Sequence, residues 1–256
     1  MSASSSVLLT TLALFLAMLV CLECGYRIGH QAGRRHPEFH EGLGAIEAAI
    51  FALLGLLLGF AFAGALSRLD ARRQLIVREA NVIGTAYLRV DLLPSADQPA
   101  VRQLFRDYLE MRLRTFDGSA NDTTDRLIRE GALLQQRLWA RIVDAAKTDP
   151  TQNVARIVVP AMNEMIDVTT ARTVALRTRL PTLIFGLLVA VAVLSAFVAG
   201  YAMAQRPRRS LLHMLLYAAT VSVTVYTLLD LDNPRVGLIR LDATDRILRE
   251  LHDSIR

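Results

Sequence analysis

Two cysteines near the N-terminus have the residue type and spacing that redox chemistry would use. Cys21 and Cys24 form a Cys-x-x-Cys motif. In redox proteins this motif opens a helix beside a βαβ sheet, and its surroundings set the reactivity of the thiols. Here it closes a run of apolar residues, so we expect neither redox nor metal chemistry. Two cysteines in 256 residues also exclude a disulfide-stapled secreted scaffold.

A second group combines imidazole and carboxylate side chains in the polar stretch that follows these cysteines. Its members are His30, His36, Glu38, His40 and Glu41. Histidine nitrogens and carboxylate oxygens are common metal ligands, but this spacing matches no established zinc pattern. We interpret the stretch as a solvated loop and expect no bound metal.

The catalytic and nucleotide-binding motifs that can be read from a single sequence are absent. The chain has no Gly-x-Gly-x-x-Gly, Walker, Gly-x-Ser-x-Gly or His-Glu-x-x-His sequence. Its arginines are scattered among carboxylates, whereas a nucleic-acid site would gather them on one face. We therefore predict that the protein is not an enzyme, needs no cofactor and binds no nucleic acid.

Four apolar segments are long enough to cross a membrane as helices. They cover residues 2–22, 45–66, 180–204 and 211–229, and Glu47 is the only Asp, Glu, Lys or Arg in them. About 20 helical residues span a hydrocarbon core, and lipid leaves the helix as the only way for such a segment to satisfy its backbone. The first segment lacks the basic start of a signal peptide, so we interpret it as a retained span.

The region between the second and third segments is charged, with apolar residues at helical spacing. It predicts a helical hairpin over about 100–117 and 122–147, packed against helices that continue out of the membrane. We therefore predict an all-α, four-span membrane protein with a helical extramembrane domain. Its parts are the first span with a short loop (1–44), the second span (45–66), the extramembrane domain (67–180), the third and fourth spans (181–231) and an amphipathic tail (232–256).

Charged side chains border these spans, where burying a charge in lipid is costly. Arg68, Arg72 and Arg73 follow the second span, and Asp230 and Asp232 end the fourth on the same side of the membrane. We predict that one of the two aspartates pairs with one of the arginines in a partly desolvated layer. Simple headgroup anchoring by arginine, or a ring that attracts ions, are the alternatives.

Small residues recur every four positions in the second and third spans. Such stripes let helix backbones approach closely in lipid, either within one subunit or between subunits. The stripes are Gly55, Gly59, Ala63 and Ser67 in the second span, and Ala192, Ala196, Gly200 and Ala204 in the third.

Three stretches resemble the bacterial bestrophin-like domain family, whose function is unknown. They are residues 63–74 (AGALSRLDARRQ), residues 79–94 (EANVIGTAYLRVDLLP) and residues 229–234 (LDLDNP) followed by Gly237. The order of four spans around a central helical region also agrees, so the resemblance covers most of residues 43–256.

The resemblance implies a fold and a candidate function. In bestrophins, five subunits surround a chloride-selective pore whose neck is lined by apolar residues of the second span. The analogy gives Phe51, Leu54, Leu58 and Phe62 as candidate lining residues. Arg68 and Arg72 would then lie at the mouth of the pore.

Two features of the sequence disagree on which side of a bacterial inner membrane the large loop lies. The bestrophin analogy places the large loop in the cytoplasm, whereas three arginines within residues 205–210 favour the short loops there. The arginines that flank the large loop tip the balance toward a cytoplasmic large loop.

The sequence alone leaves three functions open. By a small margin it favours a non-conducting, membrane-anchored interaction module, with an exposed helical face on residues 100–147. The alternative is an oligomeric protein that conducts or regulates ions, which predicts a symmetric homo-oligomer with a continuous axial path. An enzyme is the least supported of the three.

Overall fold

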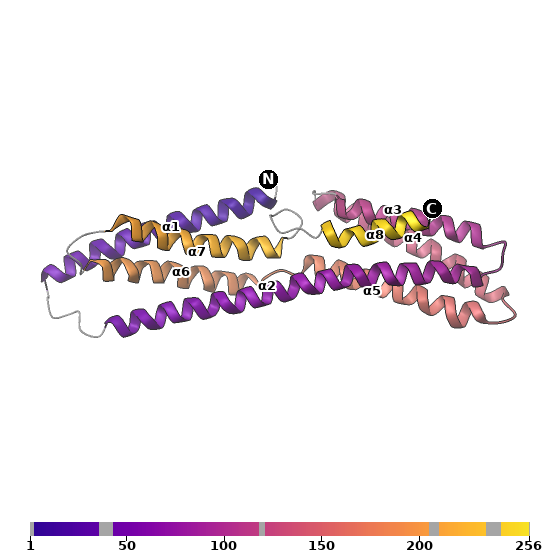
Figure 1. The fold of residues 1–256 in the computed structure, drawn as a ribbon, viewed down its shortest axis with the longest axis horizontal. Helices are drawn as coiled ribbons and strands as arrows, with labels where there is room; N and C mark the ends of the chain where they lie inside the picture. Colours follow the sequence, from indigo (N-terminus) through magenta and orange to yellow (C-terminus); the bar gives the residue numbers. More distant parts are fainter. Residues whose placement is uncertain (1–2, 36–42, 118–120, 205–209, 234–241, 256) are drawn as a thin grey trace. The chain divides into compact units, whose positions relative to one another are not determined.

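Helices joined by short connections make up the part of the chain that the structure, a computed structural model, describes (Figure 1). The described residues are 3–35, 43–117, 121–204, 210–233 and 242–255. The helices are α1 (Ala3–Arg35), α2 (Leu43–Leu88), α3 (Gln98–Asp117), α4 (Asn121–Thr148), α5 (Val159–Arg177), α6 (Thr182–Met203), α7 (Leu211–Asp232) and α8 (Asp242–Ser254). A 3-10 turn (Arg89–Leu92) follows α2, and a π-helical turn (Val154–Val158) precedes α5.

Four of the helical stretches are long and apolar enough to cross a membrane. They are Ser5–Ala32, Gly44–Leu92, Val154–Met203 and Leu211–Asp232. Each contains one of the four apolar segments, apart from residues 2–4 of the first segment and residue 204 of the third. The predicted all-α, four-span fold is therefore confirmed.

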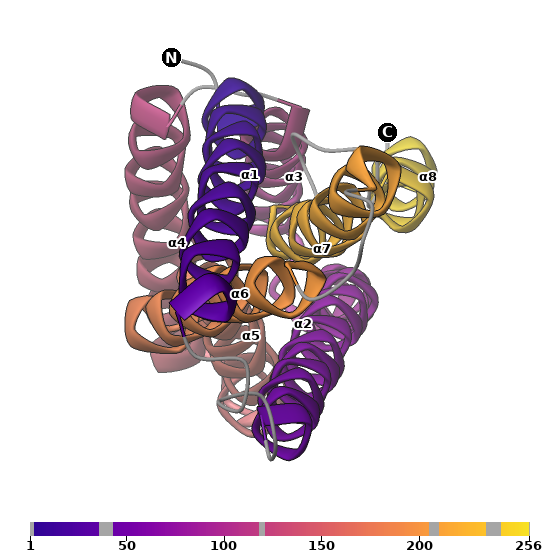
Figure 2. The same cartoon turned by 90° about the vertical axis from the view of Figure 1, so that its left-hand side faces the viewer.

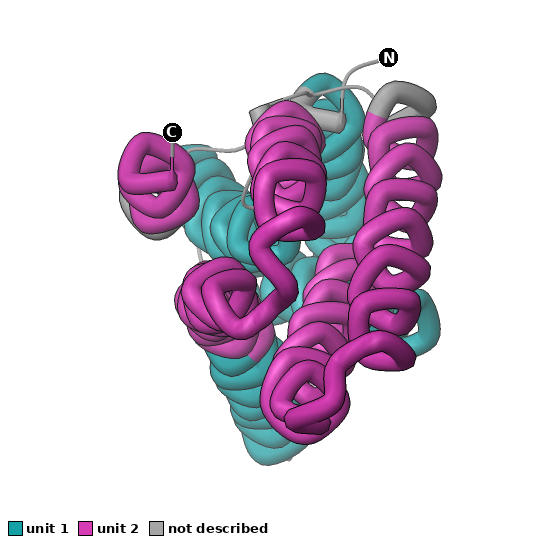
Figure 3. The backbone as a smooth tube through the Cα atoms, turned by 90° about the vertical axis from the view of Figure 1, so that its right-hand side faces the viewer, with its two compact units in different colours: residues 1–67, 179–239 teal, residues 68–178, 240–256 magenta. Residues whose placement is uncertain are grey.

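The chain forms two compact units, and both are discontinuous in sequence (Figure 3). We call residues 1–67 and 179–239 the apolar unit, and residues 68–178 and 240–256 the polar unit. Helix α2 contributes its first part to the apolar unit and its second part to the polar unit.

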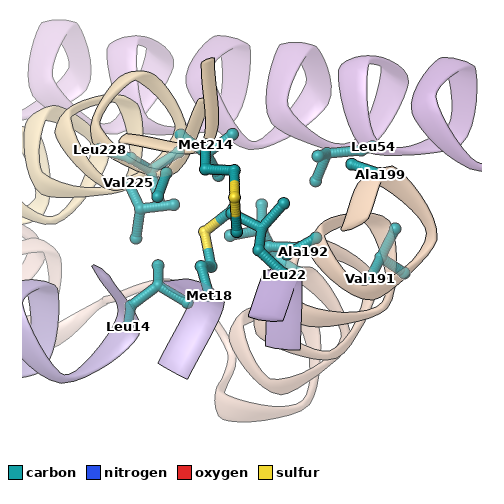
Figure 4. Packing of buried hydrophobic residues seen from close by; sticks show 14 of the residues in the cluster. Leu14, Met18, Leu22, Leu54, Val191, Ala192, Ala199, Met214, Val225 and Leu228 are labelled. Atoms are coloured by element: carbon teal, nitrogen blue, oxygen red, sulfur yellow. The ribbon is translucent and has the colours of Figure 1, made fainter. Parts of the chain in front are cut away.

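The core of the apolar unit forms where α1 packs against α6 and α7 (Figures 2 and 4). Met18 and Leu22 of α1 are fully buried there, together with Ala192 of α6 and Val225 of α7. Lipid tails are as apolar as these side chains, so moving the side chains from lipid into a protein core releases little free energy. Dispersion contacts and close packing therefore hold such a cluster together.

Three glycines set how closely α1 and α6 approach each other. A Cβ atom added at Gly25 would lie 2.0 Å from the carbonyl oxygen of Phe197, and one added at Gly200 would lie 2.0 Å from that of Leu22. A Cβ atom added at Gly29 would lie 2.8 Å from the carbonyl oxygen of Tyr201. The backbones therefore touch at positions where any other residue would hold them apart.

The polar unit is a helical bundle around the α3–α4 hairpin. This hairpin occupies the predicted region, and the buried face of α3 carries Val101, Phe105 and Tyr108. The amphipathic helix α8 packs on α3, and a Cβ atom added at Gly84 of α2 would lie 3.3 Å from Cδ1 of Leu251. The last residues of the chain are thus part of this unit, which the description of residues 232–256 as a tail did not anticipate.

Candidate functional site

The membrane part of α2 exposes one broad face. A Cβ atom added at Gly55 or Gly59 would meet nothing within 4 Å. Leu53, Leu56 and Phe60 are exposed around them. Small residues in a membrane helix mark positions where another backbone can approach closely. This face is therefore the candidate contact surface of the apolar unit.

The four candidate pore-lining residues lie on the other side of α2. Leu54 is buried in the apolar core, and Phe51, Leu58 and Phe62 are partly buried against the same cluster. The ring of Phe51 meets that of Tyr217 edge-on, with 5.9 Å between the ring centroids. In a single chain these residues contact their own subunit, and their pore-lining role stays a prediction.

The two stripes of small residues have different surroundings. Gly55, Gly59, Ala63 and Ser67 lie mostly on the exposed side of α2. In the third span, by contrast, Ala192, Ala196 and Gly200 are buried and Ala204 is half-buried. The third-span stripe thus packs within the chain against α1, whereas the second-span stripe is available to a partner.

The arginines that follow the second span have contacts within the polar unit. The guanidinium of Arg72 donates hydrogen bonds to the carbonyl oxygens of Ala175 and Thr178, at 3.1 and 2.7 Å. It therefore caps the C-terminal end of α5, where carbonyls lack helical partners and the helix dipole favours a cation. Arg73 lies 3.6 Å from Asp70, and Arg68 is half-buried.

The two aspartates at the end of α7 are buried. The Asp232 carboxylate accepts a hydrogen bond of 3.0 Å from the backbone N–H of Leu180, just before α6 begins. Asp232 therefore fastens the start of α6 to the end of α7. The pairing of Asp230 or Asp232 with an arginine stays a prediction.

Neutralising Asp230 tests that pairing. We expect Asp230→Asn to lower the yield of folded protein in membranes, because a buried cation would lose its partner. Folded yield is measured by size-exclusion chromatography after detergent extraction. The matched control is Asp253→Asn on α8, whose carboxylate is exposed. An unchanged yield for Asp230→Asn would contradict the pairing.

A buried cluster of charges lies at the centre of the polar unit. Glu79 of α2 contacts Arg112 of α3 at 2.5 Å through one carboxylate oxygen and Arg172 of α5 through the other. The three side chains are 0%, 2% and 2% exposed. One carboxylate thus links three helices, and it does so away from solvent, where charge pairs are strongest and broken pairs most costly.

Sequence reasoning missed this cluster, although the sequence carries a signal for it. Each of its charges occupies a position on the apolar stripe of its helix. Glu79 lies between Ile76 and Ile83, and Arg112 follows Phe105 and Tyr108 at helical spacing. A charge in the middle of an otherwise apolar stripe indicates a buried pair.

Tyr108 forms a separate hydrogen-bonded network, and its side chain lines the same pocket as Arg112. Its hydroxyl lies 2.9 Å from the hydroxyl of Thr169 and accepts a bond of 3.0 Å from the side-chain amide of Gln135. Thr169 in turn donates to the carbonyl oxygen of Met165, so the Tyr108 hydroxyl is the donor toward Thr169. Burial raises the pKa of Tyr108, so the phenol stays protonated and keeps this bond.

The cysteines and histidines of the N-terminal region form no site in the described part of the chain. Cys21 and Cys24 are free thiols within α1, which continues to Arg35. His30 is also in α1 and stacks on Tyr26, so placing it in a loop was wrong. His36, Glu38, His40 and Glu41 lie outside the described residues. Among described residues no group of three or more His, Cys, Asp or Glu could hold a metal.

Comparisons with solved structures give the same fold over nearly the whole chain. A tryptophan-to-alanine variant of a bacterial bestrophin homologue from Klebsiella pneumoniae matches with a TM-score of 0.65 and 14% identity, covering 98% of this chain and 95% of that one. A leucine-to-threonine variant of that homologue matches with a TM-score of 0.64 and 13% identity, covering 97% of each chain. A comparison with curated proteins gives no match.

At such low identities the structural matches show only a shared fold. A family model shows to which family the chain belongs. The model of the bestrophin-like domain matches residues 6–245. Apart from Ser5, that range includes all four candidate spans, and it includes most of the polar unit, so the resemblance noted in three short stretches extends over both units. The chain therefore belongs to the bestrophin-like domain family.

Proposed function

We propose that the protein assembles into an oligomer in the bacterial inner membrane and conducts small anions along an axis formed by α2. The observation that carries the proposal is the open face of α2 around Gly55 and Gly59. A second α2 can approach closely there, and copies related by rotation would enclose an axial path. The resemblance to bestrophins, in which five subunits surround a chloride-selective pore, supports this function over the non-conducting module that the sequence favoured by a small margin.

The charge beyond the membrane part of α2 fits an anion. Residues 68–78 contain four arginines and one aspartate, which gives a net charge of +3. Arg73 and Arg78 are well exposed, and their acidic contacts, Asp70 and Glu164, are equally exposed. A ring of such segments would raise the local concentration of anions through its potential, an effect that salt screens.

Flux in liposomes combined with a subunit count tests the proposal. The purified chain is expected to release or admit halide and to run as an oligomer by multi-angle light scattering. Gly59→Leu is expected to reduce both the subunit count and the flux, the flux at least tenfold, because a large side chain would separate the α2 backbones. A monomer without flux would overturn the proposal.

Gly186→Leu is the matched control for this variant. A Cβ atom added at Gly186 of α6 also meets nothing within 4 Å, so the two substitutions are equally tolerable within one chain. We expect Gly186→Leu to leave the subunit count and the flux unchanged. Equal losses in both variants would show that α2 does not form the contact.

A non-conducting interaction module is the second candidate function. It is favoured by a groove of about 410 Å³ between α4 and α5, whose wall includes Trp139, Gln136, Asn163 and Ile166. The same liposome experiment separates the two functions, because the module predicts a monomer or dimer without flux.

We also propose that the polar unit lies in the cytoplasm. Arg73, Arg78 and Arg177 are exposed on this unit, as the positive-inside rule expects of a cytoplasmic segment. An impermeant thiol reagent applied to intact spheroplasts tests the orientation with the variant Arg106→Cys on α3, made in a chain whose native free thiols Cys21 and Cys24 are replaced by serine. Labelling before the cells are opened would contradict a cytoplasmic polar unit.

A further inference from the structure

A pocket of about 190 Å³ lies between α3, α4 and α5 in the polar unit. It shares a wall with the buried charge cluster, because Arg112 lines the pocket and also contacts Glu79. Polar side chains line it from all three helices. They are Tyr108 and Arg112 from α3, Gln135 from α4, and Thr169, Thr170 and Thr173 from α5.

The charge of the pocket wall selects for an anion. Arg112 is the charged side chain that lines the pocket, and no Asp or Glu is among its described lining residues. The guanidinium has little room to move, since one of its nitrogens contacts Glu79 and only 2% of the side chain is exposed. A fixed, planar guanidinium is suited to carboxylate and other oxyanions, which accept hydrogen bonds from its N–H groups.

The remaining polar groups define how many donors a ligand would meet. Thr170 and Thr173 donate their hydroxyl protons to the carbonyl oxygens of Ile166 and Thr169 in their own helix. Gln135 uses one amide proton on the Tyr108 hydroxyl. A side-chain amide carries two such protons, so a second donor remains for a ligand beside Arg112.

The rest of the wall is apolar and small. Ile128 and Ala132 of α4 and Val174 of α5 line the pocket beside the polar groups. A volume of this size has room for several water molecules or one small organic molecule. A ligand that matches both kinds of wall carries a charged head and a short hydrocarbon part.

We propose that this pocket binds a small carboxylate with a short alkyl chain, its head placed between Arg112 and Gln135 and its chain toward Ile128, Ala132 and Val174. This site lies in the polar unit and does not depend on anion conduction. Binding would also tie α3, α4 and α5 together, and so stabilise the folded polar unit by mass action.

Titration of the detergent-solubilised full chain tests the pocket with two probes of the same shape. Sodium butyrate and neutral butyramide are added at constant ionic strength, and isothermal calorimetry and the thermal midpoint are recorded. Butyrate is expected to bind saturably and to raise the midpoint, whereas butyramide is expected to bind at least tenfold more weakly. Equal responses to both probes, or no saturable binding of butyrate, would overturn the proposal.

A matched pair of variants places the binding in this pocket. Gln135→Glu introduces a carboxylate beside Arg112 and is expected to weaken butyrate binding at least tenfold. Gln136→Glu adds the same charge to the next residue, which lines the adjoining Trp139 groove but not the pocket, and is expected to change the affinity less than threefold. Equal weakening in the two variants would overturn the assignment.

The single tryptophan supplies a local readout. Trp139 lies one helical turn after Gln135, and the two side chains line the same neighbouring groove. Butyrate is expected to shift the Trp139 emission in the wild-type chain and in Gln136→Glu, with the midpoint of the shift matching the calorimetric affinity. Calorimetric binding that leaves this emission unchanged would place the ligand elsewhere and contradict the proposal.

Discussion

Replacing Glu79 by glutamine is expected to cost about 3–5 kcal/mol of stability, the usual effect of removing one partner from a buried charge pair. Arg112 and Arg172 both contact this carboxylate, and all three side chains are 2% exposed or less. Without the carboxylate, the two guanidinium groups would repel each other at the centre of the polar unit. The effect is measured as a lower thermal midpoint of the detergent-solubilised protein, or as a lower yield of folded protein.

Two further variants separate charge from packing in this cluster. Glu164→Gln removes an exposed carboxylate, 3.5 Å from Arg78, and is expected to cost less than about 1 kcal/mol. Replacing Glu79, Arg112 and Arg172 together by leucine and methionine is expected to restore much of the lost stability, since no charge then remains unpaired. If Glu79→Gln lost no more stability than Glu164→Gln, the charge cluster would not be what holds the helices together.

Replacing Gly200 by alanine is expected to destabilise the apolar unit by about 1–3 kcal/mol, the range for overpacking a well-packed core. The added Cβ atom would lie 2.0 Å from the carbonyl oxygen of Leu22, and backbone atoms cannot move aside as a flexible side chain can. Helices α1 and α6 must therefore separate. The expected result is a lower thermal midpoint in detergent.

Gly186→Ala on the same helix is the control for this substitution. A Cβ atom at Gly186 meets nothing within 4 Å, and alanine favours helix more than glycine does. We expect this variant to be as stable as the wild type or slightly more stable. If Gly200→Ala and Gly186→Ala behaved alike, the close approach of α1 and α6 would carry no energetic weight.

The spans were predictable from the sequence because each is a local property. Twenty apolar residues in a row form a membrane helix whatever the rest of the chain does, and the 3.6-residue period of α3 and α4 indicates their buried faces. The end of the first helix was harder to predict from the sequence. Helix α1 continues through Cys24 to Arg35, beyond the apolar run that predicted it.

The candidate sites were harder to predict because they depend on partners far apart in sequence. Arg172 and Glu79 are 93 residues apart, and no local pattern tells which buried charge meets which. Gly25 and Gly29 have the small-xxx-small spacing of helices that approach closely. The sequence does not show that α6 is the helix that packs against them. Likewise, the apolar residues of α2 do not reveal which of its faces the chain covers.

The discontinuity of the polar unit has a consequence for how the protein is made. Residues 240–256 complete this unit, yet they follow α6 and α7 in the chain. A ribosome therefore delivers both of these hydrophobic segments to the insertion machinery before α8 exists. Until α8 is made, the surface of α3 on which it packs stays exposed. Nascent chains stalled before residue 240 should therefore be the preferred substrates of chaperones and proteases.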